Sequence, residues 1–358
     1  MYAGLRQLLF LLSPHAAHAL AFTALGPVEH LAAVRAVARA MYAPPASATL
    51  AVRVLGLEFP SPVGLAAGFD KNALRPRALA ALGFGHLELG TVTAQAQLAN
   101  PGPNLFRLPA DRALVNRLGF PNEGAQVLAR RLARARPEVP VPVGVSIGKS
   151  RAVAVDDREA VIADYVASLE AVRAVADFVV VNVSSPNTVG LRTMQAADVA
   201  RELLARLVAH AGGKPLLLKV APDLEIPHLE SLLAVVAELR MAGVVATNTT
   251  IERSGLASDA ARVSAIGAGG LSGPPLRARA VEFVRHARAR LGPRAVIMGV
   301  GGVERADHAM ALVRAGADLV QMYTGFIYEG PSAPGRIARD LAAMVAREGA
   351  GSITELRG

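Results

Sequence analysis

The amino-acid sequence predicts an α/β protein, a closed (β/α)8 TIM barrel that carries an N-terminal helical extension. The first observation is length, because 358 residues exceed the usual size of one domain but fit a single barrel with extensions. The second is a series of eight apolar runs, each followed by a helical pattern. The third is that these runs are apolar almost throughout, which is typical of parallel strands covered on both faces. Eight such units favour a closed barrel over an open doubly wound sheet.

The first 43 residues form the predicted extension, and the barrel is expected over residues 44–358. Ser13 and Pro14 have the pattern of an N-cap and a first-turn proline that begin a second helix. A third amphipathic segment spans residues 28–42, before the sequence APPAS interrupts it. Four leucines share one face of the first helix: Leu5, Leu8, Leu9 and Leu12.

No charged side chain falls between Arg6 and Glu29, so a membrane span and a signal peptide both have to be considered. Pro14, two histidines and Gly26-Pro27 interrupt this stretch, which leaves no unbroken run near the ~20 apolar residues that a span requires. The sequence HAAHA resembles a signal-peptide cleavage site only loosely. Short apolar-faced helices that lie on a membrane surface fit better. A helical pair that caps the barrel is an equally open alternative.

The eight predicted strands all end in a polar or glycine-rich signature. Active sites of (β/α)8 barrels form at the carboxyl ends of the strands, so these signatures predict the site. Residues 94–140 and 250–294 are longer than a simple crossover needs and are expected to contain insertions. The predicted strands cover residues 61–68, 86–93, 141–148, 178–185, 215–221, 243–249, 295–301 and 319–325.

Composition excludes several classes of site. The chain has no cysteine, which rules out disulfides, thiolate metal sites, iron–sulfur clusters and a cysteine nucleophile or base. The formal net charge is +9, but the arginines are scattered along helical segments with almost no aromatic residues between them, so we expect no nucleic-acid partner. A solvated arginine-rich surface explains the charge best, and attraction to an anionic membrane comes second.

The polar side chains at the strand ends indicate a hydrogen-bonding pocket rather than a metal centre. Histidine pairs at ligand spacing are absent, and the only carboxylate among these groups is Asp70, so no metal is expected. Amides, hydroxyls and two lysines suit a planar anionic ligand and a cofactor that supplies the reactivity. The candidates are Lys71, Thr91, Ser146, Asn182, Ser185, Asn187, Lys219, Thr247, Asn248 and Tyr323, with Asn116 and Arg107 from the insertions.

Three glycine clusters predict a phosphorylated cofactor. Residues 299–302 and 323–325 follow the last two strands, where barrels commonly bind phosphate, and residues 267–273 add flexible backbone nearby. Flavin mononucleotide (FMN) is the natural candidate, because Lys219 could stabilise negative charge on the reduced ring.

At these residues the chain resembles the dihydroorotate dehydrogenases, and specifically their class 2, quinone-linked, membrane-associated branch. The similarity covers nearly the whole chain, and the motifs NVSSPNTVGLR and FRLP…NRLGF are the most specific. The matching segments are SPHAAHAL, GLAAGFDKN, GFGHLELGTVT, LFRLPADRALVNRLGF, NVSSPNTVGLR, LLLKVAPDL, GVVATNTT, GGLSGPPL, GVGGV and LVQMYTGFIYEGP.

The resemblance implies oxidation of (S)-dihydroorotate to orotate in pyrimidine synthesis, with FMN as hydride acceptor and a membrane quinone that reoxidises it. It implies that Ser185 is the base and that Phe120 closes over the substrate. The implied substrate-binding residues are Lys71, Asn116, Asn182, Asn187, Asn248 and Thr249. The implied FMN contacts are Ala67, Gly68, Lys71, Thr91, Ser146, Asn182, Lys219, Thr247, Gly273, Gly302, Tyr323 and Thr324. His18, Arg107 and Tyr323 match residues at the quinone end.

The absence of cysteine favours class 2, because class 1 enzymes use a cysteine base. The resemblance then places the protein on the cytoplasmic side of the cell membrane, held peripherally by residues 1–43, which also form the quinone tunnel. Three positions depart from the family: Ser146 and Pro121 replace asparagines, and Asn104 replaces a basic residue. A serine at 146 loses or reroutes a flavin contact, so its role is the least secure.

Two other functions stay open on the sequence. One is a soluble FMN barrel dehydrogenase that uses fumarate or NAD, which the missing cysteines and the N-terminal helices disfavour. The other is a non-catalytic barrel that binds flavin or phosphate, which a positioned base disfavours.

Single residues of the predicted site also have structural alternatives: Asn187 could stabilise a turn, Asn248 could cap a segment and Arg107 could form a surface ion pair. Four of the eight asparagines match the substrate set, which favours the functional interpretation.

Overall fold

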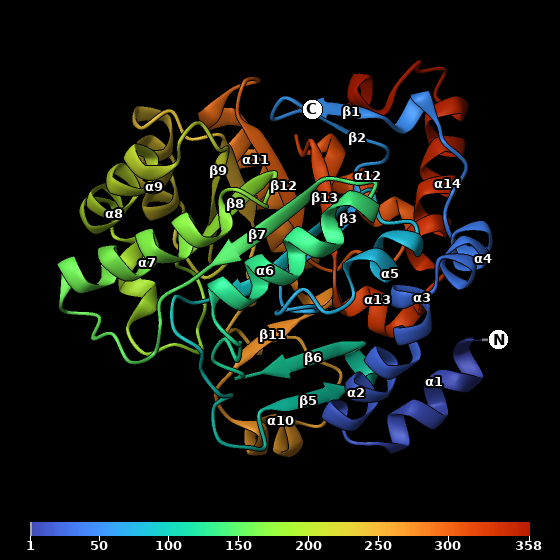
Figure 1. The fold of residues 1–358 in the computed structure, drawn as a ribbon, viewed down its shortest axis with the longest axis horizontal. Helices are drawn as coiled ribbons and strands as arrows, with labels where there is room; N and C mark the ends of the chain where they lie inside the picture. Colours follow the sequence, from blue (N-terminus) through green and yellow to red (C-terminus); the bar gives the residue numbers. More distant parts are fainter. Residues whose placement is uncertain (1) are drawn as a thin grey trace.

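The computed structural model describes residues 2–358, and its central feature is a closed barrel of eight parallel strands (Figure 1). All eight predicted strands are present and follow one another around the barrel in chain order, with the last paired to the first. The predicted fold class is therefore confirmed. The barrel strands are β3 (Val63–Leu65), β4 (His86–Val92), β7 (Val143–Ile147), β8 (Phe178–Asn182), β9 (Leu216–Val220), β10 (Gly243–Ala246), β12 (Val296–Val300) and β13 (Leu319–Met322).

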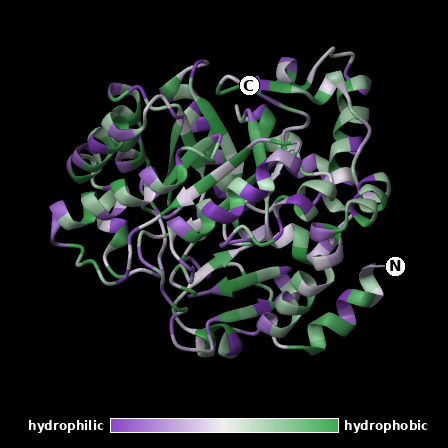
Figure 2. Cartoon of the chain, in the orientation of Figure 1, coloured by the Kyte–Doolittle hydropathy of each residue, from purple (hydrophilic) through white to green (hydrophobic). Residues whose placement is uncertain are grey.

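A ring of helices covers the outside of the barrel, which is why both faces of the strands are buried and the runs are apolar throughout. Figure 2 shows apolar residues along these strands and on the inner sides of the helices. The surrounding helices are α5 (Pro76–Ala81), α6 (Ala125–Ala135), α7 (Arg158–Val172), α8 (Ala197–His210), α9 (Ile226–Glu238), α11 (Arg277–Leu291), α12 (Ala306–Arg314), α13 (Thr324–Glu329) and α14 (Ala333–Arg347).

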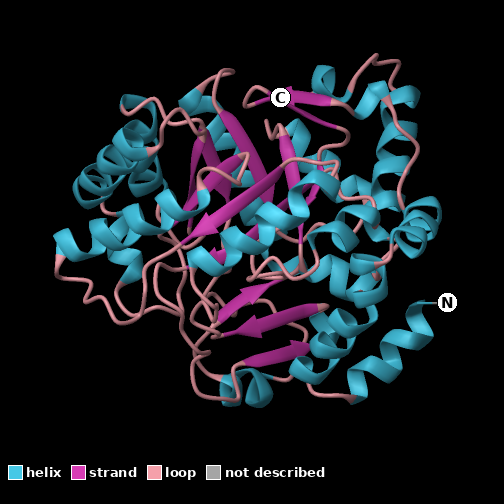
Figure 3. Cartoon of the chain, in the orientation of Figure 1, coloured by secondary structure: helices cyan, strands magenta, loops and turns pink. Residues whose placement is uncertain are grey.

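Both predicted insertions contribute to a small antiparallel sheet at the carboxyl end of the barrel (Figure 3). The first insertion forms the hairpin of β5 (Leu105–Leu108) and β6 (Ala113–Asn116). The second adds β11 (Gly270–Ser272), which pairs with β6, and the short helix α10 (Ala260–Ile266). The pairing brings Asn116 opposite Gly270 and so joins the two insertions over the barrel mouth.

The opposite end of the barrel is closed by the hairpin of β1 (Val52–Val54) and β2 (Leu57–Phe59). Phe59 is fully buried and meets the ring of His86 edge to face at 5.5 Å. His86 in turn fills the space beside Gly64, where a Cβ would lie only 2.2 Å from its ring atoms. Short 3-10 turns lie at Ala48–Leu50, Pro109–Asp111, Arg136–Glu138, Leu191–Gln195, Pro274–Leu276 and Ile353–Leu356.

The N-terminal extension is helical as predicted, with α1 (Tyr2–Leu11), α2 (Pro14–Ala24), α3 (Gly26–His30) and α4 (Ala32–Tyr42). Ser13 caps α2 by accepting a hydrogen bond from the Ala16 backbone N–H at 3.2 Å, as predicted. The third predicted helix is in fact two, because Leu31 leaves the helical conformation. Buried Glu29 explains the break, since it accepts from the backbone N–H of Ala78 at 2.9 Å and holds the end of α3 against α5. Helix α4 also packs on α5, but it runs at 112° to the segment before it.

Among the described residues, no single helix is long and apolar enough to cross a membrane. The segments Pro14–His30 and Ala32–Tyr42 meet the length and composition test only as a pair bent by 112°.

Candidate active site

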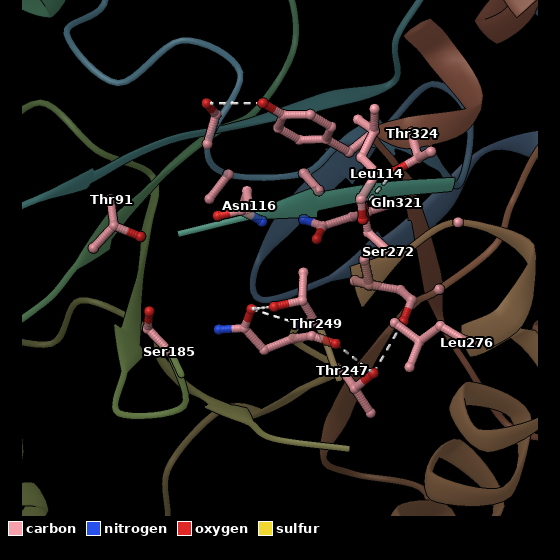
Figure 4. Close-up of a pocket in the computed structure, with 18 of the residues that line it drawn as sticks. Thr91, Leu114, Asn116, Ser185, Thr247, Thr249, Ser272, Leu276, Gln321 and Thr324 are labelled. Carbon is pink, nitrogen blue, oxygen red and sulfur yellow. Dashed lines mark hydrogen bonds between the residues drawn. The ribbon is translucent and has the colours of Figure 1, made fainter. Parts of the chain in front are cut away.

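A cavity of about 1080 Å³, open mouth included, lies at the carboxyl ends of the barrel strands beneath the small antiparallel sheet. Figure 4 shows Thr91 and Ser185 on one side, Ser272, Leu276 and Thr324 on the other, and Asn116 and Thr249 between them. Both halves of the barrel and both insertions therefore contribute to one site.

Ser185 lies three residues beyond the end of β8 and is only 4 % exposed. Its Oγ accepts a hydrogen bond from the backbone N–H of Asn187 at 3.2 Å, the local turn that the polar sequence SSPN favours. The hydroxyl lines the cavity, and no charged partner contacts it in the described chain. It is therefore a neutral, buried hydroxyl that lines the cavity.

Four asparagines surround this hydroxyl and bond to one another. Asn187 donates from Nδ2 to Asn116 Oδ1 at 3.1 Å, which joins the loop after β8 to strand β6. Asn248 donates from Nδ2 to Ser184 Oγ at 2.9 Å and to Asn182 Oδ1 at 3.3 Å. All four amides line the cavity, so the arrangement offers donors and acceptors but no charge to a polar ligand.

Arg192 ties together the two loops that carry these groups. It donates to the backbone carbonyls of Ser184 at 3.1 Å and Thr249 at 3.0 Å, and it pairs with Asp223 at 2.7 Å. Asp223 also accepts hydrogen bonds from Thr250 and the Ile251 backbone. The sequence motif contains Arg192, but its role as a link between loops depends on tertiary proximity that no local pattern signals.

Lys71 is the charged group on the barrel-mouth side of the cavity, and it donates to the Gly68 carbonyl at 2.7 Å. Burial lowers the pKa of Lys71 to about 8, and the neighbouring Asp70 carboxylate opposes that shift. Burial also raises the pKa of Asp70, against three backbone N–H groups that stabilise its charged form. A pKa near 8 still leaves Lys71 mostly protonated at neutral pH.

Glycines shape the wall formed by the last two strands and the second insertion. Gly273 has φ of 107°, and a Cβ there would lie 2.8 Å from the Arg112 carbonyl oxygen. Gly302 has φ of 68°, and a Cβ at Gly325 would lie 2.0 Å from the Val303 carbonyl oxygen. Side chains on these residues would collide with the neighbouring loops, so glycine allows the loops to pack closely, and the three glycines line the cavity with backbone alone. Gly68 is similarly close to Tyr323, whose hydroxyl donates to the Gly68 carbonyl at 3.3 Å.

The floor of the cavity is formed by side chains from inside the barrel. Lys219 on β9 and Gln321 on β13 both line the cavity, and both reach toward Glu88 on β4. Glu88 and Gln321 are absent from the candidates predicted from the sequence. Each lies inside an apolar run, where a single polar residue carries no periodic signal.

Ser146 is fully buried and does not line the cavity. Its hydroxyl lies 2.9 Å from the Thr91 hydroxyl, which in turn accepts from Asn182 Nδ2 at 3.0 Å. Thr91 and Asn182 line the cavity, so Ser146 supports two lining residues from behind.

Two of the three residues predicted for a quinone end lie outside the cavity lining. His18 on α2 stacks near Phe22 and Phe69 with ring centroids 4.5 and 5.3 Å away, and burial, with Lys71 nearby, lowers its pKa to about 4. Arg107 on β5 donates to the backbone carbonyls of Phe10 at 3.3 Å and Leu12 at 2.8 Å. Arg107 thus holds the end of α1, while Tyr323 lines the cavity and meets Phe69 edge to face.

The structure brings the other predicted site residues into one cavity. Within residues 2–358, no group of three or more histidine, cysteine, aspartate or glutamate side chains could hold a metal ion. The predicted residues that line the cavity are Ala67, Gly68, Lys71, Thr91, Asn116, Phe120, Asn182, Ser185, Asn187, Lys219, Thr247, Asn248, Thr249, Gly273, Gly302, Tyr323 and Thr324.

Comparison with known proteins identifies the family. The dihydroorotate dehydrogenase family model matches residues 49–345. A dihydroorotate dehydrogenase (quinone) from Thermobifida fusca is 53 % identical over 321 residues, 88 % of this chain and 84 % of its own length. Those from Rhodococcus opacus and Mycobacterium tuberculosis are 48 % and 46 % identical over 100 % of this chain and 99 % and 98 % of their own lengths.

Solved structures agree with the sequence relatives. The ligand-free dihydroorotate dehydrogenase of Eimeria tenella superposes with a TM-score of 0.84 at 32 % identity, and covers 97 % of this chain and 99 % of its own. The complex of the Eimeria tenella enzyme with ferulenol gives a TM-score of 0.82 at 32 % identity, over 97 % of this chain and 95 % of that one. The family match, the full-length relatives and the shared barrel agree that this chain belongs to the dihydroorotate dehydrogenase family.

Proposed function

We propose that this protein oxidises (S)-dihydroorotate to orotate, with FMN as the bound cofactor and a membrane quinone as the final oxidant. The observation that carries the proposal is the meeting of Ser185, four asparagines and a glycine wall in one cavity. The full-length relatives named dihydroorotate dehydrogenase (quinone) support the same reaction and favour a quinone over fumarate or NAD.

The cavity fits a flavin nucleotide, and enzymes of this family are flavin-dependent. Gly273, Gly302 and Gly325 line the cavity and can present only backbone to it, which supports a phosphate-binding site at this wall. Gln321 adds a buried Oε1 atom without a hydrogen-bond partner among the described residues. FMN, when bound, supplies the acceptor for the hydride from C6 of the substrate. The residues that would hold it are Ala67, Gly68, Lys71, Thr91, Asn182, Lys219, Thr247, Gly273, Gly302, Tyr323 and Thr324, with Ser146 acting through Thr91.

Ser185 is the group that takes the C5 proton of the substrate. A hydroxyl is a weak base, and it acts as one only where water is excluded and the reacting carbon is held close. The exposure of 4 % meets the first condition, and the surrounding amides meet the second. Phe120 lines the cavity and closes it over the substrate.

The amide set recognises the substrate through hydrogen bonds. Dihydroorotate presents ring N–H and C=O groups and one carboxylate, and amides can satisfy both the donors and the acceptors. Lys71 supplies the positive charge for the carboxylate. The substrate-binding residues in this proposal are Lys71, Asn116, Asn182, Asn187, Asn248 and Thr249.

Residues 1–43 form the segment that meets the membrane and admits the quinone, and residues 44–358 form the catalytic barrel. Leu8, Leu11 and Met41 on α1 and α4 are 64, 83 and 65 % exposed, as expected for helices that lie on a lipid surface. His18, Arg107 and Tyr323 belong to the quinone end, with Arg107 acting by holding α1. The protein is then peripheral on the cytoplasmic side of the cell membrane.

Purification in detergent tests this function directly. The absorption spectrum of the pure protein should show a bound flavin that dihydroorotate bleaches without oxygen, and a short-chain quinone should restore the colour. A colourless protein, or a yellow one that dihydroorotate leaves unchanged, would contradict the proposal. Restoration by fumarate or NAD instead of quinone would contradict the quinone part alone.

A further inference from the structure

Glu88 is a buried carboxylate at the floor of the cavity that does not itself line it. It is fully buried on β4, and its Oε1 lies 3.4 Å from the Lys219 ammonium on β9. Its Oε2 accepts from Gln321 Nε2 on β13 at 2.8 Å. No two of these strands are neighbours in the barrel, so the three side chains meet across its interior.

Stability alone does not explain an ion pair at this level. Apolar branched residues usually fill barrel interiors, and a buried ion pair is often no more stabilising than apolar residues of the same volume. Among residues 2–358 the pair also has only one further hydrogen bond, from Gln321. A role in the cavity above is therefore the better explanation for a carboxylate at this position.

Both partners of Glu88 line the cavity, so the carboxylate acts on a ligand through them. A carboxylate only accepts hydrogen bonds, which fixes the Gln321 amide with its NH2 group toward Glu88. The Gln321 Oε1 is then left without a partner among residues 2–358. Figure 4 shows Gln321 at the cavity that Thr249 and Asn116 also line.

We propose that Glu88 is a positioning residue that fixes the Lys219 ammonium at the floor of the cavity, offsets its charge and so would set the reduction potential of a flavin bound there. The inference rests on the proposed function, because it needs FMN in the cavity. When Glu88 is ionised, its negative charge balances the positive charge of Lys219. When Glu88 is replaced by a neutral residue, the floor of the cavity carries a net positive charge. A flavin gains negative charge on reduction, so an unpaired cation favours the reduced form.

Glu88→Gln tests this with little change of shape. The new amide can keep its oxygen toward Lys219 and donate its NH2 to Gln321 Oε1 once the Gln321 amide turns over, since Gln321 now presents Nε2 to residue 88. The midpoint potential of the bound flavin should rise, with the reduced form favoured about tenfold, or about 30 mV for a two-electron couple. An unchanged or lower potential would overturn the inference.

Lys219→Met shows whether the effect passes through the lysine. In the Lys219→Met background, adding Glu88→Gln should cause no further change in the flavin potential. An equal rise in both backgrounds would mean that Glu88 acts without Lys219, contrary to the proposal. Glu88→Asp keeps the charge one methylene farther away and should raise the potential less than Glu88→Gln, which provides the test if the glutamine variant does not fold.

Asp318→Asn is the matched control for loss of a buried carboxylate. Asp318 is 5 % exposed, precedes β13 and pairs with Arg288 at 2.7 Å and with Arg357. This variant should lower the melting temperature and leave the flavin potential unchanged, so a shift equal to that of Glu88→Gln would overturn the inference. Wild-type protein without reducible flavin would contradict the proposed function instead, so the two failures are distinguishable.

Discussion

At the residue scale, the site depends on neutral groups that are arranged by one another. The Ser185 hydroxyl is placed by an N–H two residues later, and Asn187 is placed by Asn116 from the first insertion. These groups are uncharged and bond to one another. An amide that turns toward a ligand therefore leaves no unpaired charge behind. The cost of keeping water out is therefore lower than it would be for a carboxylate base.

Replacing Ser185 by alanine should slow flavin reduction by dihydroorotate by about 10²–10⁴-fold, the usual contribution of a positioned general base. Orotate binding should change little, because the amides and Lys71 remain. Stopped-flow absorbance measures the first quantity, and titration of flavin absorbance with orotate measures the second. Thr193→Ala is the control, since its hydroxyl bonds the Gly190 carbonyl at 2.7 Å outside the cavity. An unchanged reduction rate in Ser185→Ala would remove Ser185 as the base.

The residues that the sequence did not predict share a physical reason. Glu88, Gln321 and Arg192 act across the fold, so their partners are far away in the chain. Asn182, Ser185 and Asn248 were predictable because the carboxyl end of a barrel strand is a known location for a site. Ser146 sits at such an end and faces the barrel interior, as its register partner Val180 does, but Thr91 and not Ser146 lines the cavity. The strand pattern gives the face of a side chain and does not give its depth.

At the element scale, the loops after β8 and β10 form one unit through Arg192. Its three contacts reach Ser184, Thr249 and Asp223, so the base and half of the amide set depend on a single guanidinium. A fork with several donors can serve three acceptors at once, and a lysine cannot reproduce that geometry.

Arg192→Lys should therefore raise the KM for dihydroorotate by about tenfold or more, since hydrogen bonds to charged groups contribute about 1.5–3 kcal/mol each. Flavin content should be unchanged, because the glycine wall lies on other elements. Steady-state kinetics and the visible spectrum of the pure protein measure both. Arg201→Lys on α8 is the control, because Arg201 pairs only with Asp198 and Glu238 on the helical surface. Equal KM values in the two variants would show that the link has no role in substrate binding.

The N-terminal helices show where an element could be predicted and where it could not. The helix over the N-terminal leucines and the Ser13 cap of α2 are local patterns. Leu5, Leu8 and Leu9 lie in α1 and Leu12 follows its end, while the structure confirms the cap. The break at Leu31 was not predictable, because it follows from Glu29 packing into α5. Figure 2 shows apolar residues on α1 and α2, beside the sheet of β5 and β6.

Leu8→Glu with Leu11→Glu should release the protein from membranes, because two charges would replace apolar side chains that are 64 and 83 % exposed. Sedimentation with vesicles that contain anionic lipid measures the bound fraction, and the reduction of flavin by dihydroorotate should stay at the wild-type rate. Leu98→Glu is the matched control, since Leu98 is 84 % exposed but lies in the first insertion. Equal loss of binding in both variants would indicate a general effect of charge instead of a docking face on α1.

At the scale of the whole molecule, the barrel has two ends with different tasks. The carboxyl end carries the site, and the amino end is closed by Phe59, His86 and the β1–β2 hairpin. His86 is fully buried, and neither ring nitrogen has a hydrogen-bond partner in the described part of the chain. A neutral imidazole is tolerable there, whereas a charged one would be buried without a counter-ion. The stability of the fold is thus linked to pH through a residue far from the chemistry.

Burial lowers the pKa of His86 to about 3 from an ordinary value of 6.5, and this sets the direction of the pH effect. Below pH 6.5 His86 is protonated in the unfolded chain, whereas in the folded chain it stays neutral down to about pH 3. The contribution of His86 to the free energy of unfolding is therefore complete above pH 6.5 and is lost as the pH falls. The expected slope is about 1.4 kcal/mol per pH unit between these limits. His86→Leu should remove that slope. Urea unfolding of the wild type and of the variant at pH 7 and pH 5 measures this, because the loss of unfolding free energy between the two pH values should be smaller in the variant. His228→Gln on the exposed face of α9 should keep the wild-type slope. If His86→Leu retained the wild-type slope, the acid sensitivity of the barrel would have to come from groups other than this histidine.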